Sequence, residues 1–247
     1  MMMNTQTILI SDLHLSPEVP ALNELFFRSL KEWQGKIDAL YILGDFFDVW
    51  IGDDDDGPFI QSIIDALAAF TRDTPVFVQH GNRDFLLGKA FAEKAGVALL
   101  PEQYVAELYG KSYLLVHGDE LCTDDVAYQQ FRAQSRNPMW QAAVLMKPLA
   151  ERRMLAGQIR MMSETKKNAE GKSEISDATE AGVQALLQKY ADKKITALVH
   201  GHTHRPAVHE HMFDGALIKR YVLQDWEGDK GGYLDINDKG EIKACSL

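Results

Sequence analysis

The chain has 247 residues, of which 46% are hydrophobic and 25% charged, proportions typical of a globular protein and not of a disordered or fibrous one. Its 26 basic and 36 acidic residues give a net charge of −10, which argues against a nonspecific nucleic-acid binder that relies on bulk positive charge. Its two cysteines, Cys122 and Cys245, are too few for a disulfide framework or a zinc knuckle.

Neither a signal peptide nor a membrane-spanning helix is predicted. The N-terminal segment has no basic region, and its apolar run at residues 8–10 is shorter than the roughly 7 to 15 apolar residues of a signal peptide. No uninterrupted apolar stretch approaches the about 18 residues that cross a bilayer. We therefore expect a soluble or peripheral protein.

Short apolar runs alternate with amphipathic segments along much of the chain. Apolar runs bounded by Gly, Asp or Asn predict buried strands at 8–10, 39–43, 76–78, 113–116 and 195–199. Helical periodicity predicts helices at 22–33 and 59–70, and the tail after Pro206 predicts short strands at 216–223 and 232–236. This alternation predicts an α/β core, with a second sheet from the tail packed on it.

The segment 123–191 interrupts this alternation, because it shows helical periodicity and no convincing strand. Within residues 147–172 there are seven basic and three acidic residues, a local charge of +4, interleaved with methionines. The basic residues are Lys147, Arg152, Arg153, Arg160, Lys166, Lys167 and Lys172. We interpret 123–191 as a helical cap inserted between two parts of a core, 1–122 and 192–247. The alternative is an ordinary solvated helix pair packed on the core. The acidic run 53–56 is expected to be a solvated loop.

Five of the predicted strands are each followed by side chains that can bind a metal ion. These side chains are Asp12, His14, Asp45, Asn82, His117, His202 and His204. In open α/β sheets, ligand sites lie beyond the carboxyl ends of the strands, so we expect these residues to converge on one edge. Asp-x-His and His-x-His place both side chains on the same face of an extended segment.

The type of ligand decides the class of metal. Carboxylate, amide and imidazole groups without a thiolate favour Mn²⁺, Fe²⁺, Zn²⁺ or Co²⁺ over Ca²⁺. Seven ligands suit two ions that share a carboxylate. Glycines beside the ligands, Gly44, Gly81 and Gly201, are expected to let the backbone turn sharply.

Each motif alone is a weak signal, but the ordered set is specific, and it resembles the calcineurin-like metallophosphoesterases. Further blocks resemble one family among them, the UDP-2,3-diacylglucosamine diphosphatases of bacterial lipid A biosynthesis. These blocks lie at 41–45, 50–53, 80–88, 117–119, 121–125 and 200–207. The resemblance extends from about residue 8 to residue 209.

The resemblance implies an α/β fold, a two-sheet αββα sandwich with an inserted helical, lipid-binding cap, and two Mn²⁺ ions per chain. One ion would be bound by Asp12, His14, Asp45 and His204, and the other by Asp45, Asn82, His117 and His202. The implied substrate contacts are Asn82, Arg83, Asp125, Ser163, Asn168 (or Lys167), Lys172 and His202.

The implied reaction is hydrolysis of the pyrophosphate of UDP-2,3-diacylglucosamine to UMP and 2,3-diacylglucosamine 1-phosphate. We expect a hydroxide activated by both ions to attack one phosphorus atom. Arg83 and His202 would stabilise the charge that develops in the transition state. The structural alternative for Arg83 is pairing with Asp84 or a neighbouring carboxylate.

For four further residues beside the motifs, the sequence also suggests a structural or supporting role. Asp125 could cap the helix that follows it. His80 and His200 are expected to support the ligands or to pack against them, and Asp84 could orient a histidine ligand or a metal-bound water.

The basic, methionine-rich cap suggests the partners. Flexible thioether side chains suit acyl chains, and basic residues attract anionic headgroups. We expect a cytoplasmic protein, peripheral on the cytoplasmic face of the inner membrane, that binds neither nucleic acid nor an obligate protein partner. The alternatives are another phosphoesterase of this fold acting on soluble nucleotides or phosphoproteins, and a non-catalytic scaffold.

Overall fold

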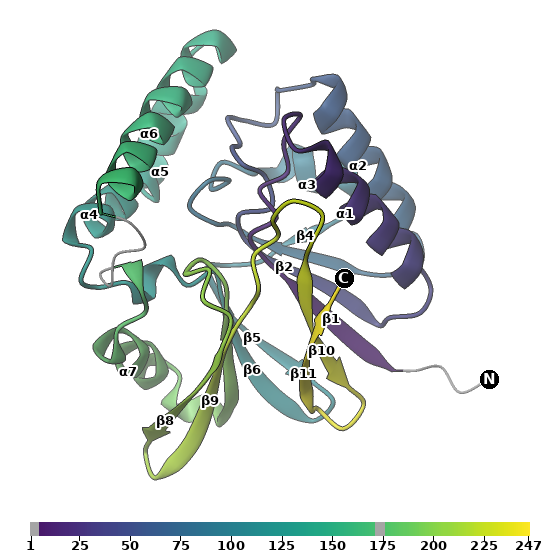
Figure 1. Ribbon diagram of the computed structural model, residues 1–247, viewed down its shortest axis with the longest axis vertical. Helices are drawn as coiled ribbons and strands as arrows, with labels where there is room; N and C mark the ends of the chain where they lie inside the picture. Colours follow the sequence, from purple (N-terminus) through teal and green to yellow (C-terminus); the bar gives the residue numbers. More distant parts are fainter. Residues whose placement is uncertain (1–4, 171–175) are drawn as a thin grey trace.

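The computed structural model describes residues 5–170 and 176–247, which form two β-sheets with helices packed outside them (Figure 1). The first sheet contains β1 (Gln6–Ile10), β2 (Ala39–Leu43), β3 (Val76–Gln79), β4 (Ala98–Leu99), β10 (Gly232–Asn237) and β11 (Ile242–Ser246). The second contains β5 (Gln103–Leu108), β6 (Lys111–Val116), β7 (Ile195–His200), β8 (Val208–Phe213) and β9 (Ala216–Val222). Their strand orders are β11-β10-β1-β2-β3-β4 and β5-β6-β7-β9-β8.

The helices fall into two groups along the chain, one that alternates with strands of the first sheet and one that lies between β6 and β7. The described helices are α1 (Pro20–Trp33), α2 (Pro58–Phe70), α3 (Lys89–Ala95), α4 (Val126–Ser135), α5 (Pro138–Leu145), α6 (Leu149–Glu170) and α7 (Glu180–Lys189), with the 3-10 turns η1 (Asp119–Leu121) and η3 (Ala191–Lys193). Prolines in the first turns of α1, α2 and α5 lock φ near the helical value, where the missing N–H costs no hydrogen bond.

Alternation along the strands builds the layers, since successive side chains of a strand point to opposite faces. In β1, Ile8 and Ile10 pack against the layer of α1, α2 and α3, while Leu9 between them faces the second sheet. In β6, Leu115 faces the first sheet, and Leu114 packs toward α7 on the outer side. The layers are therefore helices, sheet, sheet, helix, which confirms the predicted αββα fold class.

The tail divides between the two sheets, which differs from the prediction that it forms the second sheet alone. Strands β8 and β9 extend the second sheet beside β7, whereas β10 pairs antiparallel with β1 of the first. The second sheet also contains β5 and β6. Strands β4, β5, β8 and β11 and the short α3 are not among the elements predicted from the sequence. All four missed strands lie at sheet edges, where few side chains are buried, so their hydrophobic pattern is weak.

Helices α4, α5 and α6 stand beside the sandwich, with α6 next to α5 (Figure 1). Helix α7 lies within the range predicted as the cap, 123–191, yet Val183, Leu186 and Leu187 are buried against the second sheet. Its contacts place α7 in the outer layer of the sandwich, while the division into core and cap stays a prediction. Over the described ranges, no helix combines the length and apolar character required to cross a membrane.

Candidate dinuclear metal centre

The ligand-bearing loops follow the carboxyl ends of β1, β2, β3, β6 and β7, and those after β1, β2 and β7 hold their ligands in a rare backbone conformation. Asp12, His14, Asp45, His202 and His204 have φ between 48° and 64°. They are five of the eight non-glycine residues with positive φ in the described parts of the chain. Left-handed conformations of non-glycine residues cost free energy and cluster at functional sites. The loops are therefore shaped around the side chains that they carry.

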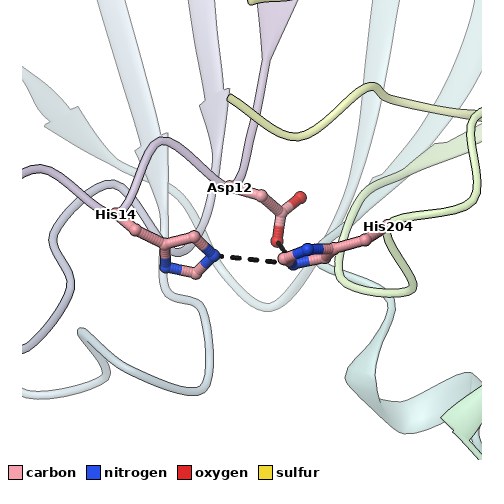
Figure 2. Close-up of side chains that lie close together, drawn as sticks. All are labelled: Asp12, His14 and His204. Atoms are coloured by element: carbon pink, nitrogen blue, oxygen red, sulfur yellow. Dashed lines mark hydrogen bonds and ion pairs between the residues drawn. The ribbon is translucent and has the colours of Figure 1, made fainter. Parts of the chain in front are cut away.

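The first group of ligands contains Asp12, His14 and His204 (Figure 2). The Nε2 atoms of His14 and His204 lie 3.5 Å apart, and His204 Nε2 lies 3.5 Å from Asp12 Oδ1. The Nδ1 of His204 lies 2.9 Å from a carboxylate oxygen of Asp225. This carboxylate fixes which imidazole nitrogen faces the group, as is usual behind metal-binding histidines. Asp225 was missed by the sequence analysis, because it lies 21 residues after His204 and in no recognisable motif.

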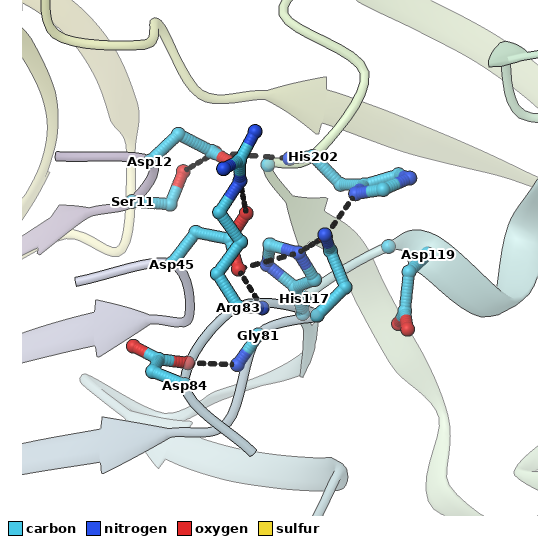
Figure 3. Close-up of polar contacts among 12 residues, drawn as sticks. Ser11, Asp12, Asp45, Gly81, Arg83, Asp84, His117, Asp119 and His202 are labelled. Atoms are coloured by element: carbon cyan, nitrogen blue, oxygen red, sulfur yellow. Dashed lines mark hydrogen bonds and ion pairs between the residues drawn. The ribbon is translucent and has the colours of Figure 1, made fainter. Parts of the chain in front are cut away.

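The second group contains Asp45, His117 and His202 (Figure 3). Asn82 lies against both histidines. The Asn82 Oδ1 atom lies 3.0 Å from His117 Nε2 and 2.8 Å from His202 Nδ1. His117 Nε2 is also 3.7 Å from Asp45 Oδ1, while its Nδ1 bonds the carbonyl of Leu43. Four potential ligand side chains from four different loops thus face one small volume.

Asp45 lies between the two groups and faces both. Its Oδ1 is 3.7 Å from His117 Nε2, and its Oδ2 is 3.9 Å from His14 Nδ1. Burial, together with the negative charges of Asp84 and Asp12, raises the pKa of Asp45 to about 7, although His117 and Arg83 oppose the shift. A buried carboxylate with one oxygen toward each group is in the position expected of a ligand shared by two cations.

The polar atoms of this site fit divalent cations. Asp12 Oδ1 and His14 Nδ1 are buried without a hydrogen-bond partner among the described residues. Burial lowers the pKa of both His14 and His202 to about 3, so these imidazoles are neutral and have a lone pair to offer. Although burial opposes it, the nearby carboxylates of Asp12 and Asp225 raise the pKa of His204 to about 9. A cation near Asp12 would take the place of that proton.

Glycines make room for the carboxylates. A Cβ atom on Gly81 would collide with Asp45, and one on Gly201 would collide with Asp12 and Ser11. Of the three glycines singled out by the sequence, only Gly44 has positive φ, at 87°. The predicted reason, a sharp turn, thus holds for Gly44, whereas Gly81 and Gly201 are needed for close approach.

Arg83 lies beside the shared carboxylate, and its structural alternative is partly realised. Its backbone N–H donates to Asp45 Oδ1 at 2.9 Å, and its guanidinium lies 3.2 Å from Asp48 and 3.9 Å from Asp45 Oδ2. Its side chain is 22% exposed, so the guanidinium borders the site. Paired with Asp48 and near Asp45, it still has donors available for a phosphate.

Asp84 does not orient a histidine in this structure. It accepts hydrogen bonds from the backbone amides of Gly81, Phe46 and Phe47 at 2.6, 2.8 and 3.4 Å. A buried carboxylate thus joins the loops after β2 and β3. His80 and His200 have supporting contacts, His80 with the carbonyl of Leu87 and His200 with the carbonyl of Gly201.

Asp125 caps α4, accepting from the backbone N–H of Tyr128, as its structural reading predicted. Tyr128, in the first turn of α4, lies beside the candidate metal ligands, with its ring centroid 5.8 Å from that of His202. The Tyr128 hydroxyl donates to Asp119 at 2.5 Å, and Arg132 and Arg136 also contact this carboxylate. Helix α4 is thereby anchored beside the site.

Three predicted substrate contacts lie on the cap, beyond the described side chains. Ser163 and Asn168 belong to α6, but their side chains are outside the described residues, as is that of Lys167. Lys172 lies outside the described ranges altogether. Their roles stay predictions.

The acidic run 53–56 is tied to other elements and is not simply a solvated loop. Asp53 accepts from the amides of Gly88 and Phe91 and from the indole of Trp50. Asp54 pairs with Arg152, and Asp55 pairs with Arg153.

Comparison with known proteins agrees with this geometry. The model of the calcineurin-like phosphoesterase family matches residues 5–206. The chain is 52% identical over 238 residues to a UDP-2,3-diacylglucosamine hydrolase of Chromobacterium violaceum, covering 96% of this chain and 97% of that one. Against a UDP-2,3-diacylglucosamine hydrolase of Cellvibrio japonicus the identity is 45% over 235 residues, with 95% and 96% covered. The crystal structure of a dimetal phosphatase from Danio rerio, 10% identical, has the same fold, with a TM-score of 0.53 and 98% of both chains covered.

Proposed function

Because the chain belongs to the calcineurin-like phosphoesterases and, among them, to the UDP-2,3-diacylglucosamine hydrolases, we propose that it hydrolyses the pyrophosphate of UDP-2,3-diacylglucosamine. The products are UMP and 2,3-diacylglucosamine 1-phosphate, an intermediate of lipid A biosynthesis. The observation that carries this proposal is the position of Asp45, which faces two groups of metal ligands at once, with Arg83 beside it.

The seven ligand side chains would hold two Mn²⁺ ions. Asp12, His14 and His204 would hold one ion, Asn82, His117 and His202 would hold the other, and Asp45 would be shared between them. Nitrogen and oxygen donors without a thiolate suit Mn²⁺, as they do the Fe²⁺, Zn²⁺ and Co²⁺ expected from the sequence, and the family resemblance favours manganese among them. When bound, the two cations supply Lewis acidity, which lowers the pKa of coordinated water and neutralises phosphate oxygens.

The protein side chains orient the pyrophosphate and balance its charge. Arg83 donates to phosphate oxygens, and its planar guanidinium suits their geometry. Because Asp48 and Asp45 already hold the guanidinium in place, little conformational entropy is lost when phosphate binds. His202, with Nδ1 directed at Asn82, joins Arg83 in stabilising the developing charge. Asp125, Ser163, Asn168 and Lys172 are the further proposed substrate contacts.

The cap supports a lipid substrate, because it exposes large apolar side chains. Those on α4, α5, α6 and the adjoining turn are 42% to 86% exposed, and they are Val126, Met139, Leu145, Met146, Met154 and Met161. Methionine side chains adapt to ligands of varied shape, which suits acyl chains. A soluble nucleotide would not need such a surface.

The decisive experiment follows UMP release from UDP-2,3-diacylglucosamine by metal-stripped protein, with and without added Mn²⁺. We expect Mn²⁺-dependent release, and its loss by at least about 1,000-fold in Asp45→Asn, because an amide has one acceptor oxygen and no charge and so cannot replace a carboxylate shared by two cations. Asp73→Asn, an exposed carboxylate that contacts Gln34, is the matched control and should keep wild-type activity.

Other outcomes of the same assay separate the competing functions. Activity on a generic aryl phosphodiester, without UMP release, would keep the metal centre but exclude the lipid substrate. Inactivity on both substrates with Mn²⁺ present would favour a scaffold.

We further propose that the cap attaches the protein peripherally to the cytoplasmic face of the inner membrane. The exposed methionines support this more than the basic residues do. The sequence led us to expect that Arg152 contacts lipid headgroups. Arg152 is only 4% exposed and pairs with Asp54, so it is not available to them. Arg153 retains a half-exposed side chain beside Asp55.

Vesicle sedimentation tests this attachment. Replacing Met146 and Met154 with aspartate should release the protein from vesicles that contain anionic lipid, because it removes apolar area and adds negative charge. Met212→Asp, at a methionine of β8 that is 63% exposed, is the matched control and should sediment like the wild type. Equal sedimentation of all variants would contradict attachment through the cap.

A further inference from the structure

A chain of buried polar side chains lies behind the loop that carries His202 and His204. Arg220 on β9 is 4% exposed, His211 on β8 is 7% exposed, and His200 at the end of β7 is fully buried. Strand β9 lies between β7 and β8, so Arg220 reaches both neighbours. Its Nη1 atom lies 2.9 Å from His200 Nε2, and its Nε atom lies 3.1 Å from His211 Nε2.

These contacts fix the protons on both imidazoles. A guanidinium only donates hydrogen bonds, so the Nε2 atom of each histidine must accept and the remaining proton is on Nδ1. His211 Nδ1 then donates to Glu180 at 2.7 Å. His200 Nδ1 donates to the carbonyl of Gly201 at 2.8 Å. The direction of donation is thus set along the whole chain from Glu180 to Gly201.

Gly201 is where this chain meets the ligand loops. Its carbonyl belongs to the peptide that leads into His202, whose φ is 64°. Its amide donates to the carbonyl of His117 at 2.9 Å, and the amide of His202 donates to Asp12 Oδ2 at 2.9 Å. A Cβ atom on Gly118 would lie 2.6 Å from the His200 ring, so this ring also packs against the loop after His117.

We propose that Arg220 is a positioning residue for the metal centre, which it acts on through His200. By donating to His200 Nε2, Arg220 holds the tautomer whose Nδ1–H binds the Gly201 carbonyl. That hydrogen bond fixes the peptide plane from which His202 and His204 project. In the other tautomer, the Nδ1 lone pair would face the carbonyl oxygen and repel it. His211 accepts from Arg220 and is itself held by Glu180, whose negative charge offsets the buried positive charge of Arg220.

This inference rests on the proposed function only in that the ligands must bind a metal. It predicts a loss of metal affinity that is separable from a loss of stability. Arg220→Met removes both donors and keeps an apolar stem, and we expect Mn²⁺ affinity to fall about 10- to 100-fold, as when other outer partners of metal ligands are removed. Ile218→Ala, on the same strand and 6% exposed, is the matched control, because it only removes core packing. It should lower the melting temperature and leave Mn²⁺ affinity unchanged.

A second pair of variants tests the hydrogen bond to Gly201 directly. His200→Asn offers an amide N–H near the position of Nδ1, whereas His200→Phe keeps a ring with no donor. We expect the asparagine variant to bind Mn²⁺ more tightly than the phenylalanine variant. This comparison decides the question if Arg220→Met does not fold.

The measurements are calorimetric Mn²⁺ titration of the metal-stripped full chain, melting of the metal-free chain, and ¹⁵N chemical shifts of the His200 ring. The ring should show a protonated Nδ1 in the wild type and a mixture of tautomers in Arg220→Met. Wild-type Mn²⁺ affinity in Arg220→Met, equal affinity in the two His200 variants, or a proton on Nε2 in the wild type would each overturn the inference. Failure of the wild type to bind Mn²⁺ would instead overturn the proposed metal site, and this inference with it, whatever the tautomer.

Discussion

Asp225 controls the orientation of His204, although it makes no contact that the sequence motifs reveal. Its carboxylate lies 2.9 Å from His204 Nδ1, leaving Nε2 toward Asp12 and His14. Asp225→Asn keeps the shape but removes the charge, and we expect Mn²⁺ affinity to fall about 10- to 100-fold. Calorimetric titration of the metal-stripped protein measures this, with Asp73→Asn as the exposed control. An affinity equal to that of the wild type would show that Asp225 does not support His204.

We expect Arg83 to act on the substrate more than on the metals. Replacing it with methionine removes donors aimed at developing negative charge, and we expect kcat for UMP release to fall about 100- to 1,000-fold. Arg83→Lys should recover only part of this loss, since an ammonium cannot make the two parallel bonds of a guanidinium. Mn²⁺ affinity should not fall in either variant, because a positive charge near Asp45 has been removed or kept. Weaker Mn²⁺ binding in Arg83→Met would assign the residue to the metal site.

At the scale of elements, Arg152 joins α6 to the core. It is 4% exposed and donates to the carbonyls of Ile51 and Lys147 as well as to Asp54. Arg152→Met leaves the Ile51 carbonyl without this donor, and we expect the free energy of unfolding to fall by roughly 1–3 kcal/mol. Arg153→Met removes only the pair with Asp55 and should change it by less than about 1 kcal/mol.

Urea unfolding of both variants, followed by tryptophan fluorescence, checks the comparison. Equal effects would mean that α6 is not anchored through the buried guanidinium. Helix α7 needs no such ion pair, because Val183, Leu186 and Leu187 bury it against the second sheet.

At the scale of the whole molecule, the metal centre joins loops from both sheets. Ligands come from β1, β2 and β3 of the first sheet and from β6 and β7 of the second. A cation bound there stabilises the sandwich by about 2.7 kcal/mol when its free concentration is 100 times its Kd. For a chain of this size that corresponds to a rise in Tm of roughly 5–11 °C.

Thermal melting with and without Mn²⁺ tests this coupling. Stripping the metal should lower Tm, and Asp45→Asn should show a smaller response, because an amide has one acceptor oxygen and no charge to share between two cations. A Tm that does not depend on Mn²⁺ in the wild type would contradict a centre that links the two sheets.

The candidate ligands and the strands that precede them could be predicted from the amino-acid sequence alone. Asp12, His14, Asp45, His117 and the final His-x-His follow short apolar runs, and this relation between a buried strand and the polar residue after it is local. The fold class followed from the alternation of strands and helices and from the ordered motifs.

Which residues far apart in the chain come together could be seen only once the chain was folded. The two faces of Asp45, the support of His204 by Asp225, and the chain from Glu180 through Arg220 to His200 depend on strand order and register. The position of Arg152 also depends on the fold. A helical pattern predicts it at the surface, but its side chain is buried and donates to Asp54 and to the Ile51 carbonyl. Hydrophobic periodicity records how each segment is buried, whereas hydrogen bonds between segments depend on where the other segments lie.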